Sequence, residues 1–252
     1  MISLKNTFLA LALTIPFISC SAQIKTNEDT NFKQSDDLKI KSTSVTYDSD
    51  LEHFIFDIRV KGIAGKSVPK AVGSLNGAPV LGYVFPTNLK STDVGFSKTE
   101  GIVALALTSH PDFDDTPLWD EDVDGNPSNA SEGVVWHPHW VVLNSDKRVA
   151  GGLSVKMFDK NDKTVKLPTT NPGMPMYMDS PGYNTITKGN SIKVVVPRFR
   201  VNNVTNFSFD GVAAYMQVNT NAMKENLPML GVYAVYSVAS GDLSLPYKVK
   251  RK

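Results

Sequence analysis

Short runs of strand-forming residues recur along this chain and are separated by turn residues. Residues 54–60 (FIFDIRV) and 192–196 (IKVVV) are rich in the β-branched and aromatic side chains that favour extended backbone. Asn76-Gly77 is one of several turn signals between the runs. The pattern predicts an all-β fold, either an antiparallel β-sandwich or an open barrel. The predicted strands span residues 38–47, 53–60, 79–85, 101–108, 134–143, 152–158, 192–201, 205–218 and 230–238.

Helical periodicity is weak along the whole sequence. The one helix candidate, residues 220–226, is short and has no wide apolar face. A chain of 252 residues is long enough to bury a conventional hydrophobic core. Residues 38–252 are therefore predicted to form a single domain that needs no disulfide.

The N-terminus has the pattern of an export signal. A charged start is followed by a largely apolar run over residues 7–18, which is too short to span a bilayer. Cys20, the only cysteine, ends the run in Phe17-Ile18-Ser19-Cys20. This motif resembles the lipobox of bacterial lipoproteins, with Phe17 in place of the usual Leu. The resemblance implies an export signal over residues 1–19, cleavage before Cys20 and a lipid anchor on that cysteine.

A second cleavage pattern overlaps the first. Cys20-Ser21-Ala22 is a small-x-small sequence, and cleavage after it would release a soluble protein that begins at Gln23. The first alternative predicts a protein anchored by lipid in the periplasm or at the outer membrane, and the second a soluble secreted protein. Residues 20–37 are mostly polar and are predicted to form a flexible tether.

Three of the four histidines are clustered and predict a metal site. His137 and His139 stand in an apolar run, and alternation along a strand puts both imidazoles on one face. If residues 101–108 and 134–143 are neighbouring strands joined by a long loop over residues 110–133, His110 lies close to His137. Three imidazoles on adjacent strands can bind zinc or copper. The alternative is that these histidines only form hydrogen bonds at a strand end.

The same part of the chain is strongly acidic. No Lys or Arg lies between Gly101 and Ser145, and eight carboxylates there need solvent or a cation to screen them. With basic residues scattered and a net charge of +1, no nucleic-acid partner is expected.

Pro138 lacks a backbone NH, which favours an edge strand and an open site. Candidates for a fourth ligand are Asp112, Asp114, Glu132 or water.

The acidic loop also contains half of a calcium-binding pattern. Asp120, Asp122 and Asp124 alternate and precede Gly125, as in the first half of a calcium loop. A calcium loop of this kind has a carboxylate at its twelfth position, but that position, counted from Asp120, is Ser131 here. The sequence leaves open a calcium-stabilised loop and a solvated acidic turn.

Three methionines form a further row. Met174, Met176 and Met178 alternate in an extended segment flanked by Pro and Gly, and can present thioethers, the soft ligands that select Cu(I). The alternative is core packing, for which methionine is well suited. If the row closes over the histidines, copper is favoured over zinc.

The sequence His137-Pro138-His139-Trp140 is locally similar to the zinc strand of the α-type carbonic anhydrases. In that family the third histidine follows the pair, whereas His110 precedes it here. The cupin pattern also begins with His-x-His but continues to a Glu, which residues 141–144 lack. These departures mean that neither family's activity is carried over.

The combined pattern indicates an exported bacterial metal-binding protein that holds or transfers zinc or copper outside the cytoplasm. A second hypothesis is a metal-dependent hydrolase or lyase with a metal-bound water and Glu132 or Asp112 as general base. A third is a calcium-stabilised surface module that uses the side chains of Trp119, Trp136 and Trp140 as a contact surface.

Overall fold

The computed structural model describes residues 31–113, 135–221 and 226–252, and the all-β prediction is confirmed. Helical structure in this part consists of α1 (Asn31–Gln34) and the 3-10 turns η1 (Asp36–Leu38), η2 (Ser91–Val94) and η3 (Arg198–Val201). No helix in these ranges is long and apolar enough to cross a bilayer. Outside the described residues lie the predicted export signal, Cys20, Asp114, Trp119, Asp120, Asp122, Asp124, Glu132 and most of the helix candidate 220–226.

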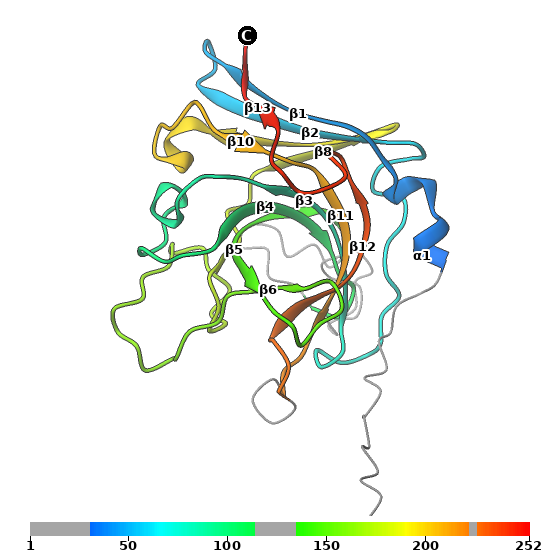
Figure 1. The fold of residues 1–252 in the computed structure, drawn as a ribbon, viewed down its shortest axis with the longest axis vertical. Helices are drawn as coiled ribbons and strands as arrows, with labels where there is room; N and C mark the ends of the chain where they lie inside the picture. Colours follow the sequence, from blue (N-terminus) through cyan, green and yellow to red (C-terminus); the bar gives the residue numbers. More distant parts are fainter. Residues whose placement is uncertain (1–30, 114–134, 222–225) are drawn as a thin grey trace, which may run out of the picture.

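Six strands close into an antiparallel barrel (Figure 1). The short strand β7 (Met178–Asp179) adds to one of them, β5. Closure satisfies the backbone hydrogen-bonding groups that an open sheet leaves at its edges. The order around the barrel is β4 (Ile102–Ser109), β3 (Pro79–Pro86), β11 (Val212–Val218), β12 (Leu230–Val238), β6 (Leu153–Val155) and β5 (His137–Ser145), which pairs back with β4.

A five-stranded sheet packs on one side of the barrel, and its two N-terminal strands lie across the top of the view in Figure 1. One pair at its edge is parallel, and the remaining pairs are antiparallel. A small two-stranded sheet is formed by β10 (Ser208–Phe209) and β13 (Tyr247–Lys248). The order in the larger sheet is β14 (Lys250–Arg251), β1 (Ile40–Asp48), β2 (His53–Val60), β9 (Ser191–Pro197) and β8 (Asn184–Lys188).

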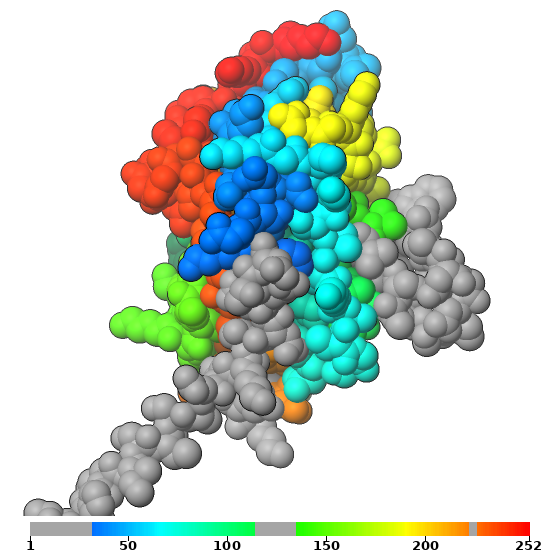
Figure 2. Space-filling model, turned by 90° about the vertical axis from the view of Figure 1, so that its right-hand side faces the viewer, coloured from blue at the N-terminus to red at the C-terminus, as the bar shows by residue number. Residues whose placement is uncertain are grey.

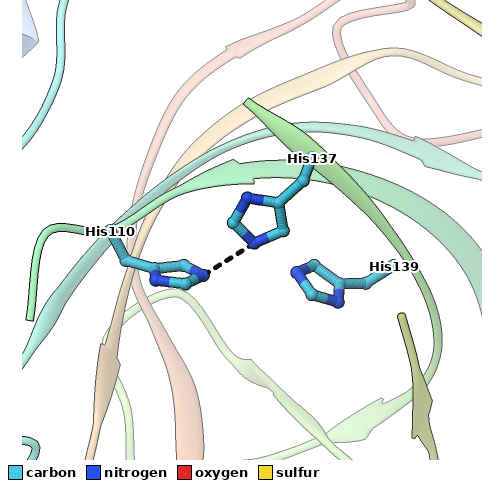
Figure 3. Close-up of side chains that lie close together, drawn as sticks. All are labelled: His110, His137 and His139. Atoms are coloured by element: carbon cyan, nitrogen blue, oxygen red, sulfur yellow. Dashed lines mark hydrogen bonds between the residues drawn. The ribbon is translucent and has the colours of Figure 1, made fainter. Parts of the chain in front are cut away.

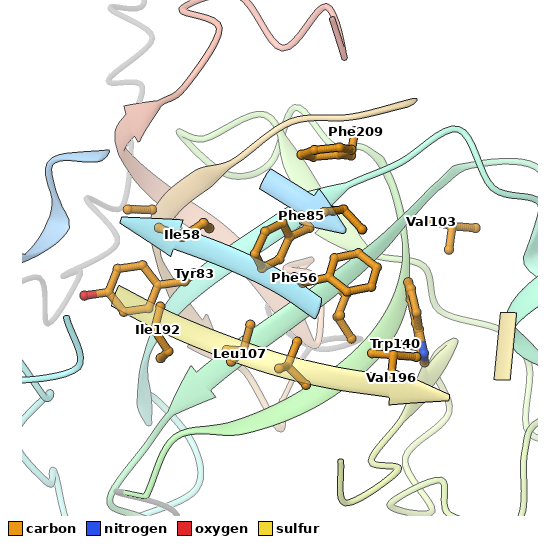
Figure 4. Close-up of a cluster of buried hydrophobic side chains, with 14 of the residues drawn as sticks. Phe56, Ile58, Tyr83, Phe85, Val103, Leu107, Trp140, Ile192, Val196 and Phe209 are labelled. Atoms are coloured by element: carbon orange, nitrogen blue, oxygen red, sulfur yellow. The ribbon is translucent and has the colours of Figure 1, made fainter. Parts of the chain in front are cut away.

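The main hydrophobic core lies between the barrel and the five-stranded sheet (Figure 4). Side chains alternate along β3, so that Tyr83 and Phe85 point into this core while Val84 points into the barrel. The ring of Phe56 from β2 meets Phe85 and Trp140 edge-on, with centroid distances of 5.2 and 6.2 Å. These aromatic contacts join the two layers.

A second cluster of buried apolar side chains fills the inside of the barrel. Small residues recur in it, among them Ala104, Ala106 and Ala214. At Gly82 an added Cβ would lie 2.6 Å from the Cε of Met216, so the methionine side chain fills the space left by the glycine. The barrel interior is therefore built largely from small residues, aliphatic side chains and methionines.

A short turn between β5 and β6 completes the barrel. The carboxylate of Asp146 accepts hydrogen bonds from the Arg148 side chain at 2.8 and 2.6 Å and from the Ser154 hydroxyl at 2.8 Å. The hydrogen bonds from Arg148 outweigh the opposing effect of burial and lower the pKa of Asp146 from 3.8 to about 2. This buried carboxylate ties the three-residue strand β6 to the end of β5.

The last residues of the predicted tether, 31–37, are folded against the domain. Phe32 packs in the main core, and the Asp37 carbonyl accepts a hydrogen bond from the Tyr83 hydroxyl at 2.6 Å. The Asp37 carboxylate accepts a second bond from the backbone NH of Ile63 at 2.8 Å. Figure 2 shows this dark blue segment lying against the cyan residues that follow β2. The rest of the predicted tether, residues 20–30, is outside the described residues.

Candidate metal centre

The pairing of β4 with β5 brings the three histidines together. In the register, Thr108 lies opposite His137 and Ala106 opposite His139, so both histidines share the inner face of the barrel. His110 directly follows β4. Figure 3 shows the three imidazoles converging. This is the arrangement expected from pairing the two predicted strands on either side of the acidic loop.

Trp140 of β5 and Trp136, which directly precedes this strand, point to the side opposite the histidines, as the alternation predicts. Trp136 and Trp140 are buried in the main core. The indole NH of Trp136 donates to the Gly65 carbonyl at 2.9 Å, and that of Trp140 donates to the Tyr183 hydroxyl at 3.3 Å. Neither side chain is available as a contact surface.

The imidazoles form a compact buried group. His110, His137 and His139 are 1%, 5% and 2% exposed. One candidate ligand atom from each lies within 4.8 Å of the other two. The Nε2 atoms of His110 and His137 are 2.9 Å apart, and the rings of His137 and His139 are nearly perpendicular with centroids 4.8 Å apart. The three residues can hold a metal ion.

Backbone carbonyls determine the tautomers of two of these rings. The Nδ1 of His110 lies 2.7 Å from the Phe113 carbonyl, and the Nδ1 of His137 lies 2.7 Å from the Val135 carbonyl. A carbonyl only accepts hydrogen bonds, so both Nδ1 atoms donate. In a neutral ring the Nε2 atom then carries the lone pair. The two Nε2 atoms lie 2.9 Å apart, with the Thr108 hydroxyl 3.5 Å from that of His137, and they are the ring atoms placed to bind a metal ion.

The third ring is oriented by Ser180, a residue that the sequence analysis did not single out. The Ser180 hydroxyl lies 2.9 Å from the Nδ1 of His139, and its backbone NH donates to the Thr170 carbonyl at 3.0 Å. Metal-binding histidines commonly hydrogen-bond through the second ring nitrogen in this way. The signal for Ser180 was its position two residues after Met178, which continues the alternation of the methionine row.

Asp112 is not part of the histidine group. Its carboxylate accepts hydrogen bonds from the backbone NH of Val72 at 2.9 Å and of Gly73 at 2.7 Å. It therefore holds the loop before β3 against the turn that carries His110. Within the described ranges, the group of candidate metal ligands consists of the three histidines.

The methionine row lies beside the histidines. Met174, Met176 and Met178 share with His110 and His139 the lining of a cavity of about 20 Å³. Its other lining residues are mostly apolar. A space of this size accommodates a single ion or water molecule. The structure thus places thioethers and imidazoles around the same small space.

The predicted edge strand at Pro138 is wrong, and the site is buried rather than open. Pro138 pairs with Leu107 inside the closed barrel. On the other side of β5, the pairing with β7 begins only at Trp140 and the pairing with β6 only at Leu143. A proline is tolerated here because it precedes both of these pairings.

An ion pair anchors β7, the short strand that carries Met178, the last residue of the methionine row. The fully buried carboxylate of Asp179 accepts hydrogen bonds from the Thr170 hydroxyl at 2.5 Å and from Arg200 at 3.0 Å. Burial raises the pKa of Asp179, and the bonds from Thr170 and Arg200 partly offset that effect. These contacts fix β7, and with it the positions of Met178 and Ser180.

Comparison of the chain with protein-family models, curated proteins and solved structures gives no match.

Proposed function

We propose that this protein binds one transition-metal ion through His110, His137 and His139 and holds or transfers it outside the cytoplasm, with copper as the preferred ion. The observation that carries the proposal is the pair of Nε2 atoms 2.9 Å apart, each opposite an Nδ1 that donates to a backbone carbonyl. In this arrangement both Nε2 atoms can act as ligands of one metal ion, together with His139. A metal cation satisfies both at once.

The choice of copper rests on charge and on ligand softness. The ligands identified in the described part of the chain are three imidazoles, which bind a metal in their neutral form. Burying an ion costs more free energy as its charge increases, which favours monovalent Cu(I) over Zn²⁺ in this apolar interior. The thioethers of Met174, Met176 and Met178 border the same space, and soft sulfur ligands select Cu(I).

Two observations favour binding over the alternative functions. A surface module that uses the tryptophans as a contact face would need them exposed, whereas Trp136 and Trp140 are buried. A hydrolase or lyase would need a carboxylate base near a metal-bound water. Of the two carboxylates considered for that role, Asp112 is bonded to backbone NH groups, and Glu132 lies outside the described residues. A buried site with apolar neighbours suits retention of an ion better than hydrolysis.

Location outside the cytoplasm is proposed from the N-terminal sequence. The apolar run over residues 7–18 and the lipobox-like motif at Cys20 support export with a lipid anchor. Mass spectrometry of the N-terminal peptide tests this point. A diacylglyceryl group on Cys20 supports the anchor, and an N-terminus at Gln23 contradicts it.

Metal analysis of the purified protein tests the central proposal. The protein is incubated with equimolar zinc and copper under reducing conditions, desalted, and examined by elemental analysis and X-ray absorption. We expect one copper per chain with both nitrogen and sulfur neighbours. One zinc per chain with nitrogen neighbours would retain the metal site but overturn the choice of copper. Absence of any stoichiometric metal would overturn the proposal.

A further inference from the structure

The barrel interior contains a second, larger cavity next to the candidate metal centre. Its volume is about 70 Å³. Among the described residues that line it, only Thr108 and His139 have hydrogen-bonding side chains, and the rest are aliphatic residues, methionine, proline and glycine. For comparison, an engineered apolar cavity of about 150 Å³ binds benzene or xenon and stays free of water. The space inside the barrel therefore suits a smaller apolar molecule.

Small side chains keep this cavity open. Ala106 from β4 and Ala214 from β11 both line it and belong to the inner cluster of buried residues. Protein interiors are otherwise packed with few voids larger than a water molecule, and unfilled space lowers stability. A single larger side chain at either alanine would fill much of the void. The presence of the cavity thus depends on these two alanines.

The cavity runs along the barrel axis. At one end it is lined by Pro86 and Val212, which lie at the end of β3 and the start of β11. At the other end it is lined by Thr108 and His139, beside the candidate metal centre. His139 also lines the small methionine cavity. The side chain of this histidine therefore lies where the two spaces meet.

Leu243 lines the end of the cavity that is remote from the histidines. Its backbone has φ 59°, in the left-handed region that a bulky residue rarely adopts. The hydroxyl of Ser240 accepts a hydrogen bond from the Leu243 backbone NH at 3.0 Å, and Ser240 is bonded in turn to the buried carboxylate of Asp210. These bonds hold the strained loop beside the cavity, where the Leu243 side chain is 38% exposed.

We propose that the barrel interior is a binding chamber for a small uncharged apolar molecule, of the size of a diatomic gas, between Leu243 and His139. The apolar side chains of the wall form no hydrogen bonds with water and do not stabilise ions, but they make dispersion contacts with an apolar molecule. Contact of this ligand with a metal rests on the proposed function. The chamber itself does not, because it is formed by the barrel residues alone.

Xenon tests the chamber in the metal-free protein. Xenon is applied to crystals under pressure, and methyl chemical shifts are followed in solution. We expect xenon density between Ala106 and Ala214, with shifts of the surrounding methyl groups. Ala214→Leu should abolish both effects, and Ala106→Val, a smaller change that preserves the fold more easily, should reduce them at least tenfold. Ala150→Leu makes the matched change at an exposed turn position and should leave xenon binding unchanged.

Carbon monoxide tests the contact with the metal in the Cu(I)-loaded protein. A stretching band of bound CO in the native protein, weakened at least tenfold by Ala214→Leu but not by Ala150→Leu, supports entry through the chamber. A CO band that both variants leave unchanged would overturn entry by this route. If copper does not bind, the proposed function fails, while the xenon experiment still decides the chamber. Absence of xenon from the barrel of the native protein would overturn the proposal of a binding chamber.

Discussion

The Nε2 atoms of His110 and His137 face each other at 2.9 Å inside a closed β-barrel, although the two residues are 27 positions apart in the chain. Each ring is fixed by a backbone carbonyl that lies close to it in sequence, three residues after His110 and two residues before His137. The orientation of both rings is thus determined locally, while the contact between them depends on strand pairing. Metal affinity should accordingly respond to the rings themselves and to the groups that orient them.

Removing any one histidine should weaken metal binding. We expect His110→Ala, His137→Ala and His139→Ala each to lower the affinity by about tenfold or more, because each removes one neutral nitrogen ligand. Acidification should also weaken binding, since a proton competes with the metal for the same lone pair. Titration calorimetry measures both effects. His53→Ala is the control, because His53 lies on β2 in the other sheet; equal affinity in all four variants would mean that the histidine cluster is structural.

Ser180 should act as a positioning residue. Its hydroxyl lies 2.9 Å from the Nδ1 of His139, so Ser180→Ala removes the group that orients the ring without removing a ligand. We expect metal affinity to fall by roughly tenfold, the scale measured for groups that orient metal ligands, and Ser180→Thr to restore most of it. Ser191→Ala is the matched control, since Ser191 is also buried but donates to Asp57 in the five-stranded sheet. A lower melting temperature of Ser180→Ala with unchanged metal affinity would show that the role of Ser180 is purely structural.

The methionine row should raise the affinity of the site for Cu(I) but not for zinc. Met178 lines both barrel cavities, whereas Met216 lines only the larger one. We expect Met178→Leu to lower Cu(I) affinity by about tenfold while zinc affinity changes less than twofold, because a thioether is a soft ligand. Competition with a Cu(I) chelator measures the first quantity and calorimetry the second. Met216→Leu makes the same chemical change away from the small cavity, and an equal effect of the two variants on Cu(I) would contradict a role for the row.

Asp146 should stabilise the barrel at neutral pH and not in strong acid. Its pKa is lowered from 3.8 to about 2 in the folded protein, so the unfolded chain takes up the proton first as the pH falls. The stabilisation is fully present above about pH 4 and is lost between about pH 4 and pH 2. Asp146→Asn should lower the free energy of unfolding by about 2 kcal/mol at pH 7 and have little effect near pH 2.

Urea denaturation at several pH values measures this difference. Asp36→Asn is the control, since the Asp36 carboxylate pairs with Lys39 on the surface, where such pairs contribute little. A cost of Asp146→Asn that is the same at pH 7 and pH 2 would show that the carboxylate charge is not the source of the stabilisation.

Much of the sheet structure follows from local composition. The predicted strands over 53–60, 79–85 and 230–238 match β2, β3 and β12 within one residue. The missed strands are β7, β8, β13 and β14. β8 has the sequence NTITK and forms an edge of its sheet with mostly exposed side chains, so it lacks the apolar alternation that identifies a half-buried strand. The other three are two residues long, too short to carry any periodicity.

The candidate site could be predicted in part, because the alternation of side chains along a strand is also a local property of the sequence. Alternation along one strand predicts that His137 and His139 share a face, and the adjacent strand brings His110 near them. Closure of the barrel could not be read from the sequence, because it depends on β5 pairing with β4 on one side and with the short strands β6 and β7 on the other. Burial of the site, the overturned edge strand at Pro138 and the contact with Ser180 all follow from that closure.

The alternation of tryptophan and histidine over residues 136–140, at the start of β5, has a consequence for folding. A shift of this strand by one residue against β4 would turn the tryptophans into the barrel and the histidines into the aromatic core. Such a misaligned barrel would lose its candidate metal ligands from the interior and its largest side chain from the core. Under the proposed function, a metal ion would stabilise only the correctly aligned strand and would thereby favour the native register.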